Sequence, residues 1–151
     1  DAGTGLFVLA ATSNPESFAL QRAVLADGSG EGRTVAASIV DEVAAANRER
    51  QNAAPQRVEA SMGSIGIVLG ATAKLGEYGI GLDQLSSRPA APILAPGFGH
   101  QGARYEQLPE LYGPAAPYVL VSASRSILSA GPSGVAEAIQ AQAAEVARSR
   151  G

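Results

Sequence analysis

The chain has 151 residues and a formal net charge of −3, and 46% of its residues are hydrophobic. This length suits one domain, and the absence of cysteine excludes a disulfide scaffold, a thiolate metal site and a cysteine nucleophile. The mild acidity and the lack of tryptophan disfavour a nucleic-acid partner. No apolar run reaches membrane-spanning length and no signal-peptide pattern is visible, so we expect a cytoplasmic protein with no membrane partner.

Four short apolar runs, at residues 6–11, 65–69, 91–95 and 118–121, are the candidate strands. Each run is continuous rather than alternating, which is typical of parallel strands that are covered on both faces. Each run ends in a small, polar or glycine-rich turn. The pattern therefore predicts four parallel strands.

Helical patterns follow these runs. The segment 14–26 begins with Asn14, a typical N-cap residue, and with Pro15 at the first helical position. Helical spacing would turn Leu20 and Val24 of this segment inward. The segment therefore predicts a helix against the first strand.

Two longer helices are predicted over 34–48, from apolar residues on one helical face, and over 133–148, from an alanine-rich stretch. Residues 50–62 are polar and predict a loop. Residues 74–88 predict a short helix or loop, and residues 104–111 predict a short helix. The chain thus repeats a strand–helix unit four times.

Two α/β architectures accept such a repeat: a free-standing doubly wound sheet, or half of a (β/α)₈ barrel, which needs about 250 residues when complete. The chain opens on Asp1 and enters an apolar run almost at once, which favours a piece of something longer. In both architectures, ligands bind at the carboxyl ends of the strands.

Two loops at predicted strand ends carry residues that suit an anion. Residues 96–102 hold three glycines, which allow tight turns and expose backbone N–H groups, and Gln101 adds a neutral donor. Arg125 follows the fourth run, where a guanidinium and backbone N–H groups would suit a phosphate. Taken singly, the loops suggest a plain glycine–proline turn and a solvated arginine. Because they follow successive strands, they together predict a phosphate site.

Other polar residues give weaker signals. Ser13 offers a hydroxyl after the first run, although the same cluster suits the polar start of a helix. His100 is the only histidine and Lys74 the only lysine, and we expect both side chains to face solvent. The sequence shows no catalytic triad, no metal-ligand spacing and no Walker loop, so neither a metal nor a cofactor is predicted.

Several motifs in chain order resemble one family. They are Phe-Val-Leu-Ala-Ala-Thr-Ser-Asn-Pro at 7–15, Gly-Ile-Val-Leu-Gly-Ala-Thr at 66–72, Ile-Leu-Ala-Pro-Gly-Phe-Gly-His-Gln-Gly at 93–102, and Ser-Arg-Ser-Ile at 124–127. Together they closely resemble the C-terminal half of orotidine 5'-phosphate decarboxylase, in the branch called type 2. The resemblance implies a partial (β/α)₈ barrel in which residues 1–151 form the C-terminal half of one barrel domain and supply strands five to eight.

The resemblance also implies an activity. The family is a carboxy-lyase of de novo pyrimidine biosynthesis that converts orotidine 5'-phosphate to uridine 5'-phosphate and CO₂ without metal or organic cofactor. The full-length parent is expected to be a homodimer. Seven residues would contact the substrate: Ser13, Pro96, Gly97, Gly99, Gln101, Ser124 and Arg125.

The resemblance gives these seven residues separate roles. Ser13 would contact the pyrimidine ring, and Gln101 would link the base side of the pocket to the phosphate side. Arg125 and the backbone around Ser124 would hold the phosphate. The remaining three would belong to the glycine-rich loop that covers the ligand.

The chain departs from the family in its catalytic residues. The family uses an alternating Lys–Asp–Lys–Asp array, with an Asp-x-Lys-x-x-Asp motif on the third strand and one aspartate from the neighbouring subunit. Such an array combines electrostatic preorganisation with a positioned acid. Asp-x-Lys does not occur here, and Lys74 follows the second predicted strand. No catalytic residue is therefore predicted, the chain alone is expected to be inactive, and the missing N-terminal half-barrel is its expected partner.

Two other functions stay open. One is another ribulose-phosphate-binding barrel enzyme, such as a sugar-phosphate decarboxylase or an aldolase, which would share the phosphate loops without a pyrimidine contact. The other is a non-catalytic phosphate-binding half-barrel. Because open apolar sheet edges associate, we expect the isolated chain to be oligomeric, aggregation-prone or marginally folded.

Overall fold

Four parallel strands form one sheet in the computed structural model, which describes residues 4–53 and 62–150. The strands are β1 (Leu6–Ala11), β2 (Ile65–Leu69), β3 (Ile93–Pro96) and β4 (Val119–Ser122). The four predicted strands are confirmed, but the third begins at residue 93 rather than 91 and the fourth at residue 119 rather than 118.

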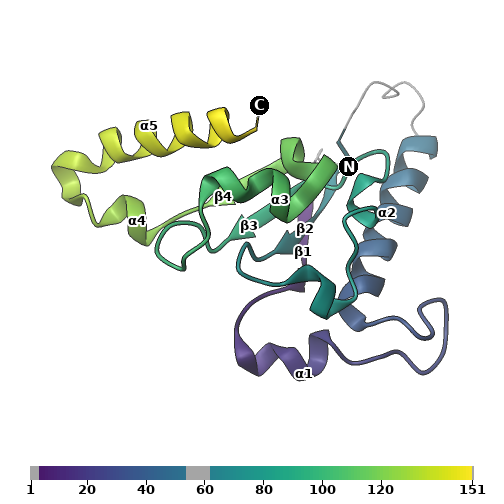
Figure 1. Cartoon of the computed structure of the whole chain (residues 1–151). Helices are drawn as coiled ribbons and strands as arrows, with labels where there is room; N and C mark the ends of the chain where they lie inside the picture. The colour runs from purple at the N-terminus through teal and green to yellow at the C-terminus, as the bar shows by residue number, and fades with distance from the viewer. Residues whose placement is uncertain (1–3, 54–61, 151) are drawn as a thin grey trace.

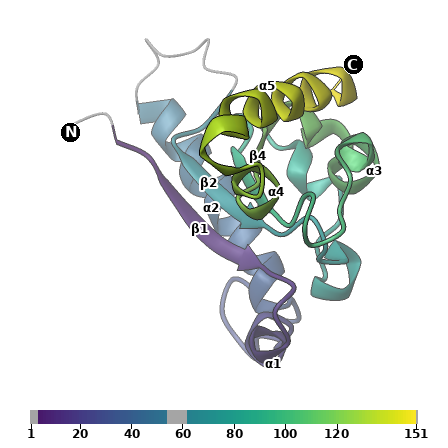
Figure 2. The ribbon, with the colours of Figure 1, turned by 90° about the vertical axis from the view of Figure 1, so that its left-hand side faces the viewer.

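The strand order separates the two architectures that the sequence left open. A doubly wound sheet reverses its strand order at a switch point, whereas a barrel adds each strand beside the last one. Here the order in space is β1-β2-β3-β4, the same as along the chain, with β1 and β4 at the edges (Figure 1; Figure 2). The described residues therefore form an open barrel segment.

Helices connect the strands. The two long ones are α2 (Val35–Ala53), between β1 and β2, and α5 (Gly131–Ser149), after β4; they lie on opposite sides of the molecule (Figure 1). The short helices are α1 (Phe18–Gln21), α3 (Leu108–Tyr112) and α4 (Arg125–Leu128). The 3₁₀ turns are η1 (Pro15–Ser17), η3 (Leu75–Tyr78), η4 (Gln84–Ser86), η5 (Tyr105–Gln107) and η6 (Gly113–Tyr118).

Most helix predictions are confirmed. The segments 34–48 and 133–148 correspond to α2 and α5, and 104–111 to η5 and α3. Residues 74–88 hold two 3₁₀ turns. The loop expected over 50–62 is wrong at its start, because α2 continues to Ala53, and residues 54–61 lie outside the described part of the chain.

The helix expected over 14–26 is wrong in its length and in its buried face. The segment forms η1 and one turn of α1, and Val24 then makes an antiparallel bridge to Thr34. This backbone pairing, which turns the chain back toward α2, replaces further helical turns. Leu20 and Val24, expected to face inward, are 69% and 63% exposed.

Two adjacent rows of apolar side chains cross the sheet on opposite faces. The outer row is Val8, Ile67, Ile93 and Val119, and the inner row is Leu9, Val68, Leu94 and Leu120. Ile67, Ile93 and Val119 are each 1% exposed, whereas Leu9 and Leu120 are 52% and 46% exposed. The expectation of strands covered on both faces is therefore wrong at Leu9 and Leu120, where the inner face is open, whereas the outer face is covered over β2, β3 and β4.

Buried polar groups fasten the outer layer to the strands. The Asn47 amide of α2 donates to the Ile65 carbonyl (2.8 Å) and accepts from the Ile65 amide (3.0 Å). A Cβ at Gly63 would lie within 2.5 Å of this amide, so only glycine fits there. Tyr112 donates to the Leu69 carbonyl (2.9 Å), and burial raises its pKa. These bonds hold the helices in one register against the sheet.

The helices also bear on the expectation about membranes. Among residues 4–53 and 62–150, no helix combines the length and the apolar character needed to cross a bilayer.

Candidate functional site

A cavity of about 250 Å³ opens at the carboxyl ends of β3 and β4. Its lining comes from the end of β3 and the loop after it, and from the end of β4 through the first residue of α4. The lining residues are Pro96, Gly97, Phe98, His100, Gln101, Ser122, Ala123, Ser124 and Arg125. The two loops that the sequence singled out thus lie side by side.

Glycines shape the loop after β3. Gly97, Gly99 and Gly102 have φ values of 115°, 72° and 103°, in the left-handed region that favours glycine. The Gly99 amide donates to the Ala103 carbonyl (2.9 Å), and the Gly102 amide donates to the Gly99 carbonyl (3.0 Å). These two amides are therefore used inside the loop and do not face a ligand.

Gln101 folds back over Gly97. A Cβ added at Gly97 would lie 3.4 Å from the Gln101 Oε1 atom and 3.4 Å from the Thr72 Oγ1 atom. A Cβ there would make ordinary contact with Gln101, but the positive φ of Gly97 would strain any other residue. Gly97 and Gln101 thus lie close together at the cavity wall.

Helix α5 supports the loop from behind. The Tyr105 hydroxyl donates to the Gln142 Oε1 atom (2.5 Å), and the Ser126 hydroxyl donates to the same oxygen (3.3 Å). Phe98 stacks on Tyr105 with ring centroids 5.4 Å apart. Burial raises the pKa of Tyr105, so its hydroxyl stays protonated as a donor. A Cβ at Gly99 would lie 2.9 Å from Ser126, so the two cavity loops touch there.

The charge of the lining is positive or neutral. Arg125 and His100 are its basic residues, and none of the lining residues is a carboxylate. In the described part of the chain, the ion pairs join Arg22 to Glu77, Arg33 to Asp41 and Lys74 to Glu77, so neither basic residue of the cavity is paired. An anion would meet two donors without a competing acid.

Five of the seven predicted contact residues line this one cavity: Pro96, Gly97, Gln101, Ser124 and Arg125. Gly99 lies within the same loop but does not line the cavity. Ser13 lies after β1 and does not line it either. The roles of all seven in binding stay predictions.

Ser13 lies beside a local network of polar side chains but is not part of it. Thr12, Asn14, Ser17 and Gln21 hydrogen-bond to one another through their side chains. Asn14 stands at the N-cap of η1 but makes no side-chain capping bond. Among the described residues, the Ser13 hydroxyl makes no hydrogen bond, so it is left available to a ligand.

The sequence predicts that Lys74 and His100 both face solvent. This is confirmed for Lys74, whose side chain is 83% exposed and whose Nζ atom lies 3.5 Å from the Glu77 carboxylate. His100 is exposed, but it also lines the cavity, which the sequence reasoning missed. Its position directly before Gln101 in the glycine-rich loop was the available signal. The described residues bring no three histidine or acidic side chains together as a possible metal site.

Known proteins match this chain over part of their length. Orotidine 5'-phosphate decarboxylase of Salinispora arenicola is 44% identical over 130 residues, which cover 86% of this chain and 40% of that protein. The enzyme of the same name from Streptomyces coelicolor is 40% identical over 133 residues, or 87% and 41% of the two chains. No family model matches the chain.

The chain is homologous to part of orotidine 5'-phosphate decarboxylase. It spans about 40% of the length of these relatives. The structure of UMP synthase from Leishmania donovani is similar at a TM-score of 0.64 and 22% identity, covering 97% of this chain and 28% of that one. That likeness shows the fold: the sheet and its helices are a partial (β/α)₈ barrel, as the sequence predicted.

Proposed function

We propose that residues 1–151 form the C-terminal half of an orotidine 5'-phosphate decarboxylase barrel, supply strands five to eight, and bind the phosphate and pyrimidine of orotidine 5'-phosphate and uridine 5'-phosphate. The parent enzyme would release CO₂ in pyrimidine biosynthesis, as a cytoplasmic homodimer without a cofactor. One observation supports this most: Arg125 and four other predicted contacts line one cavity at the strand ends.

The proposed phosphate position follows from the charges of the cavity. Arg125 supplies planar N–H donors that suit a phosphate group, and Gln101 supplies a neutral donor on the opposite loop. The volume of about 250 Å³ lies below the usual range for whole ligands, so it suits one end of a nucleotide. The base would then extend along the strand ends toward Ser13.

The chain's own residues would bind and orient the substrate but would not decarboxylate it. The cavity lining holds no lysine and no carboxylate, so it lacks both members of the Lys/Asp array that the resemblance implies for the reaction. Remote phosphate binding accelerates a reaction only where reacting groups can use that binding energy. The catalytic Lys/Asp array would therefore come from the other half of the barrel.

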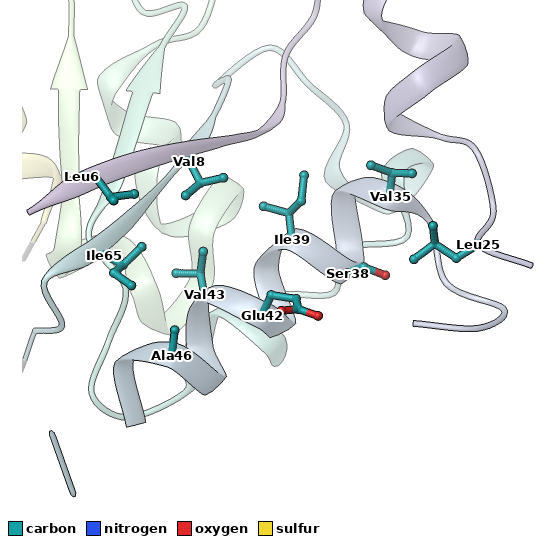
Figure 3. A pocket seen from close by; sticks show the side chains of 10 residues that line it. All are labelled: Leu6, Val8, Leu25, Val35, Ser38, Ile39, Glu42, Val43, Ala46 and Ile65. Carbon is teal, nitrogen blue, oxygen red and sulfur yellow. The ribbon is translucent and has the colours of Figure 1, made fainter. Parts of the chain in front are cut away.

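The exposed apolar surfaces of the chain are where the other half of the barrel would pack. The inner row leaves Leu9 and Leu120 half-exposed, and among the described residues β1 pairs with β2 on one side and with no strand on the other. Beside β1 lies an apolar groove of about 470 Å³ (Figure 3). In that view Leu6 and Val8 of β1 face Ile39 and Val43 of α2 across it.

We propose that the apolar face of a helix packs into this groove, while a strand of the same half-barrel pairs with β1. Relatives more than twice as long as the matched region have the residues to supply both. Burying an apolar groove of this kind is the main driving force for such docking. Glu42 at the groove rim would favour a basic residue on that helix.

Titration calorimetry with uridine 5'-phosphate tests the binding site. Arg125→Ala should weaken binding by about tenfold to a hundredfold, because a charge-assisted hydrogen bond is lost. Lys74→Ala is the matched control, since it removes an exposed cation outside the cavity, and it should bind as the unaltered chain does. Equal affinities for all three proteins would refute the site.

A CO₂-release assay with orotidine 5'-phosphate tests the division of labour. The chain alone should show no turnover. Turnover should appear when it is mixed with the part of the Salinispora arenicola enzyme that lies outside the match. Decarboxylation by the chain alone at the rate of a complete enzyme would overturn the proposal.

A further inference from the structure

The cavity contains a second basic side chain to which the proposed function assigns no role. His100 lines the same cavity as Arg125, from the loop on the opposite side. Imidazole is the side chain whose charge changes between about pH 5 and 8, so it can add a positive charge near neutrality. A cavity with both residues has one fixed and one switchable charge.

None of the residues that line the cavity with His100 carries a negative charge. Strands β3 and β4 contribute Pro96 and Ser122 to the cavity, and the loop after β3 contributes Phe98 and Gln101 as neutral neighbours. Helix α4 contributes its first residue, Arg125, which is the single charged residue besides His100 in the lining. No carboxylate of the described residues forms an ion pair with the imidazole. Its natural partner is therefore an anion inside the cavity.

We infer that His100 is a second, pH-dependent contact for the phosphate group, so that the cavity binds a doubly charged anion more tightly when the imidazole is protonated. This inference rests on the proposed phosphate site. The side chain is exposed and unpaired, so it can turn toward the anion without breaking a bond. His100 would set how strongly the chain holds phosphate, without taking part in the chemistry.

The sign of the effect follows from linkage. A bound dianion favours the protonated imidazole, so affinity is highest at low pH and falls as the imidazole loses its proton. The change is modest, because exposed charge pairs contribute little: about threefold to fivefold in affinity. Phosphate itself gains a proton near pH 6, so sulfate, which stays doubly charged over this range, is the cleaner probe.

A nuclear magnetic resonance titration tests the contact directly. His100 is the only histidine of the chain, so its ring C–H signals need no assignment by mutation. Saturating sulfate should move the midpoint of the His100 titration upward by about 0.5 pH units, the counterpart of the affinity ratio. A midpoint that does not move with sulfate would overturn the inference.

Calorimetry with His100→Gln completes the test. The unaltered chain should bind sulfate about threefold to fivefold more tightly near pH 5.5 than near pH 8, and the variant should lose this dependence. Lys74→Gln, which alters an exposed cation outside the cavity, should keep it. If Arg125→Ala abolishes binding and His100→Gln changes nothing, the phosphate site stands and the role of His100 fails. If the unaltered chain binds neither sulfate nor uridine 5'-phosphate, both fail together.

Discussion

The two faces of the sheet carry the same kind of side chain and meet opposite environments. Ile93 of the outer row and Leu94 of the inner row are neighbours in one strand, as are Val119 and Leu120 in the next. The outer side chains are 1% exposed, whereas Leu120 is 46% exposed. Buried hydrogen bonds such as those between Asn47 and Ile65 join the outer helices to the strands.

This difference teaches that apolarity alone does not report burial. Parallel barrel strands are apolar on both faces because the interior of a barrel is packed with side chains. In the described chain the outer face has its helices, and the inner face has no layer against it. The inner row therefore marks the surface where we propose that the rest of a barrel packs.

The largest effect should come from truncating the outer row. Ile93→Ala removes a buried side chain and leaves a cavity under the helices, which should lower the free energy of unfolding by about 2–5 kcal/mol. Urea unfolding followed by circular dichroism measures the loss. Leu120→Ala in the neighbouring strand is the matched variant, and it should cost less than about 1 kcal/mol because the side chain is already half in water.

The same two substitutions, Ile93→Ala and Leu120→Ala, can also be compared in a complete barrel. If the rest of a barrel covers the inner face, Leu120→Ala becomes a core truncation and should cost about 2–5 kcal/mol there. Equal costs of the two substitutions in the isolated chain would show that the inner face is already covered.

The sequence predicted the strands and the cavity loops because local features determine both of them. These features do not depend on which other parts of a barrel are present. A continuous apolar run bounded by turn residues marks a buried parallel strand, and β1 and β2 have the predicted bounds. Glycines that require positive φ, such as Gly97, mark a loop shape that other residues cannot adopt. Successive parallel strands then bring Gln101 and Arg125 to one cavity.

The wrong predictions of burial have one physical cause. An apolar pattern shows which side chains could be buried, but it does not show whether another part of the protein packs against them. Leu20 and Val24 have helical spacing, yet no described layer covers them and the chain turns back after α1. The inner row likewise has the apolar side chains of a core, but Leu9 and Leu120 at its two ends are about half exposed. His100 was expected in solvent because its loop is exposed, and whether an exposed side chain also lines a cavity depends on the second loop across from it.

The next largest effect should be on self-association, which we expect to depend on the inner face of the sheet. We expect the isolated chain to sediment as an oligomer, because half-exposed leucines and the free β1 edge favour association. Leu9→Glu and Leu120→Glu should each weaken it by about tenfold or more, since a charge would be buried without a partner. Leu128→Glu on α4, at a leucine that is 67% exposed, is the control and should leave sedimentation unchanged. A monodisperse monomer of the unaltered chain would contradict the idea that the inner face seeks a partner.

The smallest effect concerns a ligand that spans the strand ends from Arg125 to Ser13. Ser13→Ala removes a hydroxyl that makes no hydrogen bond to the described part of the chain, so a pyrimidine contact of about 0.5–1.5 kcal/mol should be lost. Uridine 5'-phosphate should then bind a few-fold more weakly, while ribose 5-phosphate, which has no base, should bind as before. Ser17→Ala, which alters a hydroxyl already bonded to the Asn14 carbonyl (2.7 Å), should affect neither ligand. An unchanged affinity for uridine 5'-phosphate in Ser13→Ala would favour a barrel enzyme that acts on a sugar phosphate without a base, because the phosphate cavity beside β3 and β4 would then be the whole of the binding site.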